Sequence, residues 1–213
     1  MKTIKKICTV VFGFLLILAG YAQEGPENTW SVGINAGLHT GFSPMGNHEA
    51  PEIYEPGVLQ IRGKKMFGEQ FGVMAGAQYN LIDIDYTPET HYIMFFAHGL
   101  TDLLRLMDVN ILNNKTGVLV HAGLGMSGMW QQEGLVNPKP SRLFDGVDEM
   151  ICVGGGLMPY YKVSDNFSVN LDYAFNLLFH QSRNFDMADL NEQQGMNGKY
   201  MTLTLGVCYH FDI

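Results

Sequence analysis

The C-terminal residues of the chain alternate between two kinds of side chain. Every second position from Met201 to Phe211 is apolar, and the positions between them carry mainly small or polar residues. The apolar positions are Met201, Leu203, Leu205, Val207, Tyr209 and Phe211, and the others are Tyr200, Thr202, Thr204, Gly206, Cys208 and His210. Because successive side chains on a strand point to opposite faces, this pattern predicts a half-buried β-strand over residues 200–213.

The same period of two recurs along most of the chain. The predicted strands cover residues 30–42, 58–62, 71–81, 91–106, 118–126, 151–161, 167–180 and 200–213. An even number of antiparallel strands predicts an all-β fold, an eight-stranded up-and-down transmembrane β-barrel whose last strand pairs with its first. The segment 58–62 has the weakest pattern, and without it the count would fall to seven.

Residues that favour turns separate the predicted strands. Residues 63–65 and 163–166 are predicted to be tight turns, and residues 43–57, 131–146 and 182–198 to be long loops. The fourth segment carries apolar residues on both faces. A helix over residues 100–107 is therefore an alternative for its last part.

The N-terminus has the features of a secretory signal peptide. Lys2, Lys5 and Lys6 precede an apolar run, and Gly20-Tyr21-Ala22 fits a small-x-small cleavage site. We expect residues 1–22 to be removed and residues 23–213 to form one barrel domain. The chain is then expected to reach the outer membrane of a Gram-negative cell.

Composition narrows the possible partners. The net charge of −8 argues against a nucleic-acid partner, which would favour a basic surface. An exported chain could form a disulfide between Cys152 and Cys208. However, a whole predicted strand separates them, roughly 10 Å at about 4.8 Å per strand. Because a disulfide spans at most about 7 Å between Cα atoms, we expect two free cysteines.

Alternation alone does not say which face meets lipid. A soluble lipocalin-like barrel would hold its apolar face inside around a ligand. Three features favour the membrane alternative: aromatic residues lie near strand ends, the opposite face is rich in glycine and polar residues, and the chain ends in an aromatic strand.

With lipid outside, the polar residues of the strands point into a lumen that eight strands make just wide enough for side chains. The predicted inward residues are Asn35, His39, Arg62, Gln78, His98, Asp102, His121, Asn170, Asp172 and His210. Arg62 is expected to pair with Asp102 or Asp172, because an unpaired buried charge is costly. The predicted lumen network comprises Arg62, Asp102, Asp172, His98, His121 and His210, either as a structural plug or as a narrow conduit.

Four stretches together resemble the small outer-membrane barrels that include the OmpA-type transmembrane domain. They are Trp30-Ser31-Val32-Gly33, Gly123-Leu124-Gly125, the hairpin from Tyr160 to Phe167, and Gly206 to Phe211. The resemblance implies the barrel alone, without the peptidoglycan-binding domain that often follows it. It also implies that Tyr209 and Phe211 form a C-terminal insertion signal, with the barrel-insertion machinery and outer-membrane lipid as partners. No extracellular partner is implied.

Little in the sequence indicates catalysis. His180 and Ser182 resemble part of the His-x-Ser-Asn motif of lipid A deacylases, but Arg183 stands where that motif has Asn. No metal-ligand spacing or cofactor motif emerges, and Gly154-Gly155-Gly156 is interpreted as close wall packing. The sequence therefore favours a non-enzymatic barrel with a structural or surface role, at most a narrow porin-like pore. A lipid A esterase is the alternative.

Overall fold

The computed structural model describes residues 29–42, 55–82, 89–109, 115–131, 147–185, 187 and 197–212. Within these residues the chain forms eight strands and a four-residue helix. Their bounds are β1 Thr29–Phe42, β2 Glu55–Met66, β3 Phe71–Ile82, β4 Thr90–Asp102, α2 Leu103–Leu106, β5 Thr116–Gln131, β6 Asp148–Lys162, β7 Phe167–Phe179 and β8 Asn197–Asp212. The signal peptide predicted over residues 1–22 lies outside the described residues.

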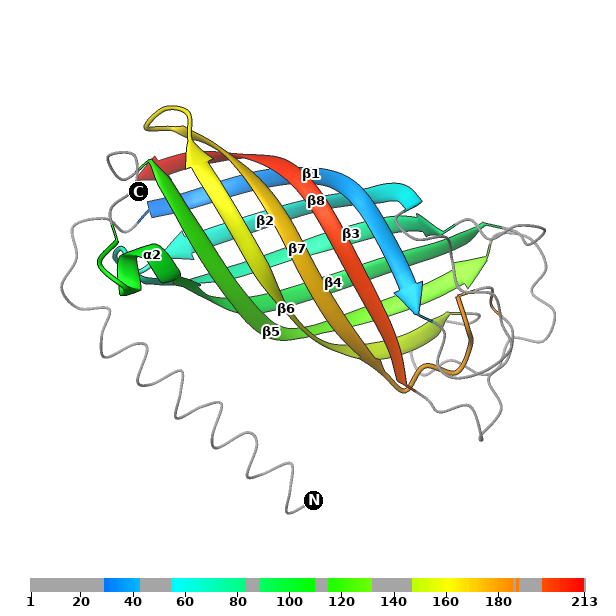
Figure 1. The fold of residues 1–213 in the computed structure, drawn as a ribbon. Helices are drawn as coiled ribbons and strands as arrows, with labels where there is room; N and C mark the ends of the chain where they lie inside the picture. Colours follow the sequence, from blue (N-terminus) through cyan, green and yellow to red (C-terminus); the bar gives the residue numbers. More distant parts are fainter. Residues whose placement is uncertain are drawn as a thin grey trace, which may run out of the picture.

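The eight strands form one closed antiparallel barrel. Each strand pairs with the next in sequence, and β8 closes the sheet on β1 in a register that runs from Thr29 opposite Asp212 to Phe42 opposite Lys199. Figure 1 shows β1 and β8 side by side, with all strands tilted against the long axis as closure of a small barrel requires. The predicted fold and its closing strand pair are confirmed.

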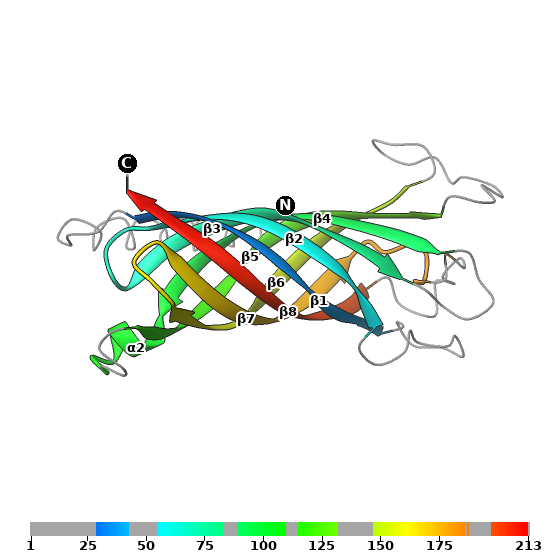
Figure 2. The same cartoon turned by 90° about the horizontal axis from the view of Figure 1, so that it is seen from above.

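The two ends of the barrel differ. β1 begins and β8 finishes at one end, beside α2 and the turns at residues 67–70 and 163–166 (Figures 1 and 2). We call this the turn end, and the opposite end the loop end. In outer-membrane barrels the short turns face the periplasm, so we expect the turn end to be the periplasmic side.

β2 is longer than its sequence pattern indicated. It includes residues 63–66, so the turn predicted at 63–65 is wrong and the real turn covers residues 67–70. At the other end of β2, the predicted loop residues Pro56 and Gly57 also belong to the strand. A register shift in β1 between Gly37 and Leu38 accommodates them, and Gly57 adopts a φ of 147°. Such a bulge tolerates a proline that cannot donate to the ladder.

The helical alternative for the end of the fourth segment proves partly correct. β4 finishes at Asp102, and α2 replaces the last four residues of the predicted strand. Asp102 caps this helix, because its Oδ1 accepts the N–H groups of Leu104 at 3.0 Å and Arg105 at 3.4 Å. One oxygen of the Asp102 carboxylate is thus used by the helix at the turn end.

The outer wall carries the apolar residues of the alternating pattern. Ile34, Phe95 and Leu205 are 57–66% exposed, whereas the intervening polar residues are buried. At the turn end, Phe167 and Tyr209 lie on this wall with ring centroids 5.1 Å apart, where an aromatic girdle belongs. A lipocalin-like barrel requires the reverse arrangement, so that alternative is wrong.

No helix in the described part of the chain is long and apolar enough to span a membrane.

Candidate functional site

The lumen holds the polar side chains that the alternating pattern placed inside. All ten predicted inward residues are buried. Eight strands curve tightly enough for side chains from opposite walls to meet. The lumen is therefore the place to look for a site.

A salt bridge crosses the middle of the lumen. Arg62 on β2 donates from Nη1 to Oδ2 of Asp172 on β7 at 2.7 Å, and both side chains are almost fully buried. Arg62 also donates from Nη2 to the side-chain oxygen of Asn170. Asp172 is thus the partner of Arg62, and the alternative pairing with Asp102 does not occur.

Two histidines extend this network toward β4. The second oxygen of Asp172 lies 3.0 Å from Nε2 of His121 on β5. The Nδ1 atoms of His121 and His98 are 2.9 Å apart, so one of these nitrogens donates and the other accepts. Their rings stack at 5.0 Å between centroids. Arg62, Asp172, His121 and His98 therefore form one connected polar row across four strands.

Amides connect this row to the remaining walls. Asn35 on β1 donates from Nδ2 to Oδ1 of Asn170 at 2.8 Å and to Oγ1 of Thr204 at 3.2 Å. On the other side, Gln60 donates to Gln78 at 3.2 Å. Most of these polar side chains are hydrogen-bonded to one another. Together they form a packed polar layer across the lumen.

Glycines make room for this layer. A Cβ at Gly206 would overlap the side-chain amide of Asn35, and one at Gly156 would lie 2.7 Å from Nε2 of His121. The interpretation of Gly154-Gly155-Gly156 as close wall packing is confirmed. The absence of side chains at Gly154 and Gly156 leaves space for the side chains of Asn176 and His121.

Asp102 and His210 lie outside the central layer, toward the turn end. Besides capping α2, Asp102 accepts a hydrogen bond at 2.7 Å from the hydroxyl of Tyr160. Nε2 of His210 lies 2.7 Å from Oγ of Ser168. The predicted six-residue network is thus divided between the centre of the lumen and its mouth.

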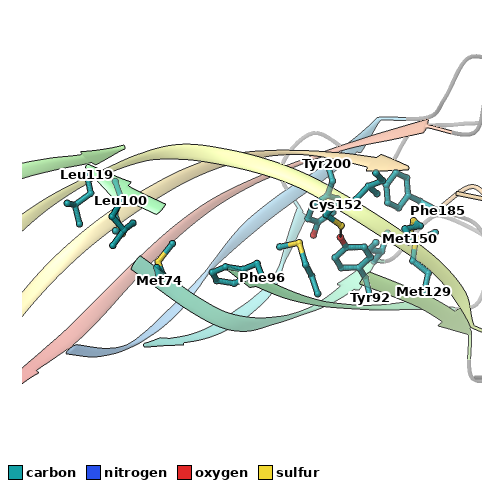
Figure 3. Close-up of a cluster of buried hydrophobic side chains, with 14 residues drawn as sticks. Met74, Tyr92, Phe96, Leu100, Leu119, Met129, Met150, Cys152, Phe185 and Tyr200 are labelled. Carbon is teal, nitrogen blue, oxygen red and sulfur yellow. Dashed lines mark hydrogen bonds between the residues drawn. The ribbon is translucent and has the colours of Figure 1, made fainter. Parts of the chain in front are cut away.

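Apolar side chains fill the lumen on both sides of the polar layer. Figure 3 shows Leu100 and Leu119 toward one end, and Tyr92, Tyr200 and Phe185 toward the other. The Tyr92 and Tyr200 rings stack at 5.0 Å, and the Phe185 ring centroid lies 6.0 Å from that of Tyr200. These side chains and the polar layer together fill the middle of the described lumen.

Phe185 is a lumen residue that the sequence pattern missed. It belongs to the predicted loop 182–198, yet its side chain is fully buried beneath the loop end. Two nearby residues in the sequence, Asn184 and Gln181, are also buried. An isolated aromatic residue in a polar loop was the available signal.

The proposed nucleophilic pair does not have a catalytic arrangement. His180 follows the last residue of β7 with a φ of 66° and is exposed. The backbone N–H groups of Ser182 and Arg183 each donate to Oδ2 of Asp148 at 2.9 Å. Among the described residues, no hydrogen bond joins His180 to Ser182 or to an acid. Asp148 therefore anchors the backbone instead of orienting an imidazole.

Both described cysteines are free and buried, as expected. Cys152 donates to Oγ of Ser127 at 3.1 Å, and Cys208 accepts from Asn170 at 3.4 Å. Within the described ranges, no group of three or more His, Cys, Asp or Glu side chains is arranged to hold a metal ion.

Known structures share this architecture. Neisserial surface protein A is similar with a TM-score of 0.60 at 12% identity, covering 87% of this chain and all of that chain. A major outer-membrane protein of Thermus thermophilus gives a TM-score of 0.54 at 14% identity, with the same coverage of both chains. OprG of Pseudomonas aeruginosa gives 0.50 at 9% identity, covering 89% of this chain and 99% of that chain.

No protein-family model matches the chain, and no curated protein sequence matches it significantly. The structural likeness defines the class: the chain has the fold of the small eight-stranded outer-membrane barrels. Its exposed apolar wall fits the same class. The fold and the exposed apolar wall are thus those of an outer-membrane β-barrel.

Proposed function

We propose that the protein is a non-enzymatic outer-membrane barrel with a structural or surface-interaction role, and that it conducts at most as a narrow pore. The observation that carries the proposal is the Arg62–Asp172 salt bridge across the lumen. It lies between apolar layers that include Leu119 and Tyr92. An ion moving along the axis would have to displace both kinds of packing.

The geometry at the end of β7 supports the absence of catalysis. An activated serine needs a base within hydrogen-bond reach and a third group that orients the base. Here the nearby acid, Asp148, accepts two backbone N–H groups, and His180 is exposed. A lipid A esterase using His180 and Ser182 is therefore the less favoured function.

A surface role would rest on the loop end. The longest connections join β1 to β2, β5 to β6 and β7 to β8 there; they are the predicted loops 43–57, 131–146 and 182–198 without the residues that belong to strands. Loops on a rigid scaffold are common recognition sites. We further propose outer-membrane lipid as the partner of the apolar wall. The barrel-insertion machinery would recognise Tyr209 and Phe211, whose rings stack with their centroids 6.1 Å apart.

Single-channel recording in planar bilayers tests the closed lumen. The wild-type barrel should show no steady large conductance, and the double variant Arg62→Ser/Asp172→Ser should conduct more than wild type because the crossing pair is removed. A steady large conductance in wild type would contradict the proposal.

The enzymatic alternative has its own test. Lipid A from cells that express wild type, Ser182→Ala or no protein should have the same mass spectrum. Loss of acyl chains with wild type alone would establish the esterase instead.

A further inference from the structure

Five polar side chains form a continuous row around the turn end of the lumen. In strand order they are Lys64 on β2, Ser31 on β1, His210 on β8, Ser168 on β7 and Lys162 on β6. Ser31 lies opposite both Lys64 and His210, and Lys162 lies opposite Ser168. The hydrogen bond between Ser168 and His210 joins the two halves of the row.

This row borders a cavity of about 200 Å³. Lys64, Ser31, His210 and Lys162 line it, and Asp102 and Tyr160 contribute to its lining. The cavity lies below the apolar layer that contains Leu119. A solute would reach it from the turn end, which is the periplasmic side.

Neither lysine of the row forms an ion pair with an acid. None of the salt bridges among the described residues involves Lys64 or Lys162. Their charges are close enough to interact with each other and with His210. Lys64 is half-buried, and its Nζ lies 5.8 Å from the centroid of the Tyr160 ring. Two like charges held together at a partly buried site favour an anion between them.

Ser31 gives a second, independent indication. Its side chain is 2% exposed, and its Oγ has no hydrogen-bond partner among the described residues. A buried hydroxyl without a partner is costly. Because Ser31 lines the cavity between Lys64 and His210, its hydroxyl is placed to donate to a ligand held by the lysines.

The carboxylates that line the cavity form no ion pair with either lysine among the described residues. Oδ1 of Asp102 accepts two backbone N–H groups of α2, and Oδ2 accepts the Tyr160 hydroxyl. Glu69 also lines the cavity, from the exposed turn at residues 67–70, and is in no salt bridge with Lys64 or Lys162. The donors that remain for a ligand are therefore cationic or neutral.

We propose that this row is a binding site for a small oxyanion that enters from the periplasmic side, such as inorganic phosphate. Lys64 and Lys162 supply charge-assisted hydrogen bonds, and the Ser31 hydroxyl supplies a neutral one. The side chains point into the lumen, and the sheet separates them from lipid. The ligand is thus a soluble anion and not a lipid headgroup.

Isothermal titration of the refolded full barrel in detergent with inorganic phosphate, at constant ionic strength, tests the proposal. Wild type should bind phosphate saturably. Lys64→Gln and Lys162→Gln should each weaken binding roughly tenfold, because each removes a charged hydrogen bond. Ser31→Ala, which keeps every charge, should weaken it by a smaller factor.

Lys65→Gln is the matched control. Lys65 follows Lys64 on β2, but it points outward, with its Nζ 4.8 Å from the centroid of the exposed Trp30 ring. This variant makes the same charge change and should bind like wild type. Heat-dependent gel mobility would show that each variant is folded. Absence of saturable binding by wild type, or an equal loss in folded Lys65→Gln and Lys64→Gln, would overturn the proposal.

Discussion

Arg62 and Asp172 meet across the barrel at 2.7 Å, although 110 residues separate them in the sequence. They belong to β2 and β7, which are not neighbours in the sheet. The contact therefore connects opposite walls through the lumen. It depends on closure of the barrel, because no local strand pairing brings the two residues together.

Removing one partner of this pair should destabilise the barrel strongly. Asp172→Ala leaves the guanidinium buried without its carboxylate, and His121 also loses a partner. The expected loss in unfolding free energy is about 3–5 kcal/mol, as for other broken buried pairs. Urea unfolding of the barrel refolded in lipid would measure it.

Two further variants complete this experiment. Asp165→Ala, in the exposed turn at 163–166, should lose little stability. The double variant Arg62→Met/Asp172→Leu should recover much of the loss, because no unpaired charge remains. Equal stability of Asp172→Ala and Asp165→Ala would show that the pair contributes nothing.

The sequence pattern predicts most of the fold because lipid imposes a strict rule on one face of each strand. β7 follows the rule throughout, with apolar residues outward at every second position, and its prediction is one residue too long. In β2 the alternation of apolar and polar residues is hard to recognise, because Lys65 faces outward and Pro56-Gly57 resembles a turn. Its outer face could be recognised only once its neighbours were known.

The contacts within the lumen were harder to predict than its residues. Alternation placed Arg62, Asp102 and Asp172 inside, but strand stagger decides which of them share a level. Asp102 lies at the end of β4 and caps α2, which leaves Asp172 to Arg62. The row at the turn end does not follow from the sequence pattern, because the pattern predicts a turn at Lys64.

The glycines at the inner wall should be intolerant of even one methyl group. A Cβ at Gly206 would overlap the Asn35 amide, so Gly206→Ala should lower the unfolding free energy by about 1–3 kcal/mol. At Gly63 no atom lies within 4 Å of an added Cβ, and Gly63→Ala should leave stability unchanged or slightly raised. Urea unfolding would compare the two variants. The same loss in both would contradict the close packing at Gly206.

The cysteines should react only when the barrel unfolds. Cys152 is 1% exposed and Cys208 is 5% exposed, and both are free. In the mature chain, predicted to begin near Gln23, a bulky maleimide should label neither thiol in the folded band and both after boiling in SDS. Ser164→Cys, in an exposed turn, should add one rapidly labelled thiol. Labelling of folded wild type at the rate of Ser164→Cys would contradict the inward placement of both cysteines.

A charge on the outer wall distinguishes a membrane barrel from a soluble one. Leu205 is 66% exposed and lies within β8, opposite Ala36 on β1 and Leu171 on β7. Leu205→Arg should cost about 2–4 kcal/mol of unfolding free energy in a phospholipid bilayer, because the guanidinium replaces an apolar side chain near the midplane. Val163, in the turn at 163–166, is similarly exposed at 59%, and Val163→Arg should cost far less because that turn meets water. If water surrounded the wall, both substitutions would fall within about 0.5 kcal/mol of wild type. Urea titration of both variants in the same bilayer gives the comparison, and equal small losses would contradict burial of the β8 wall in lipid.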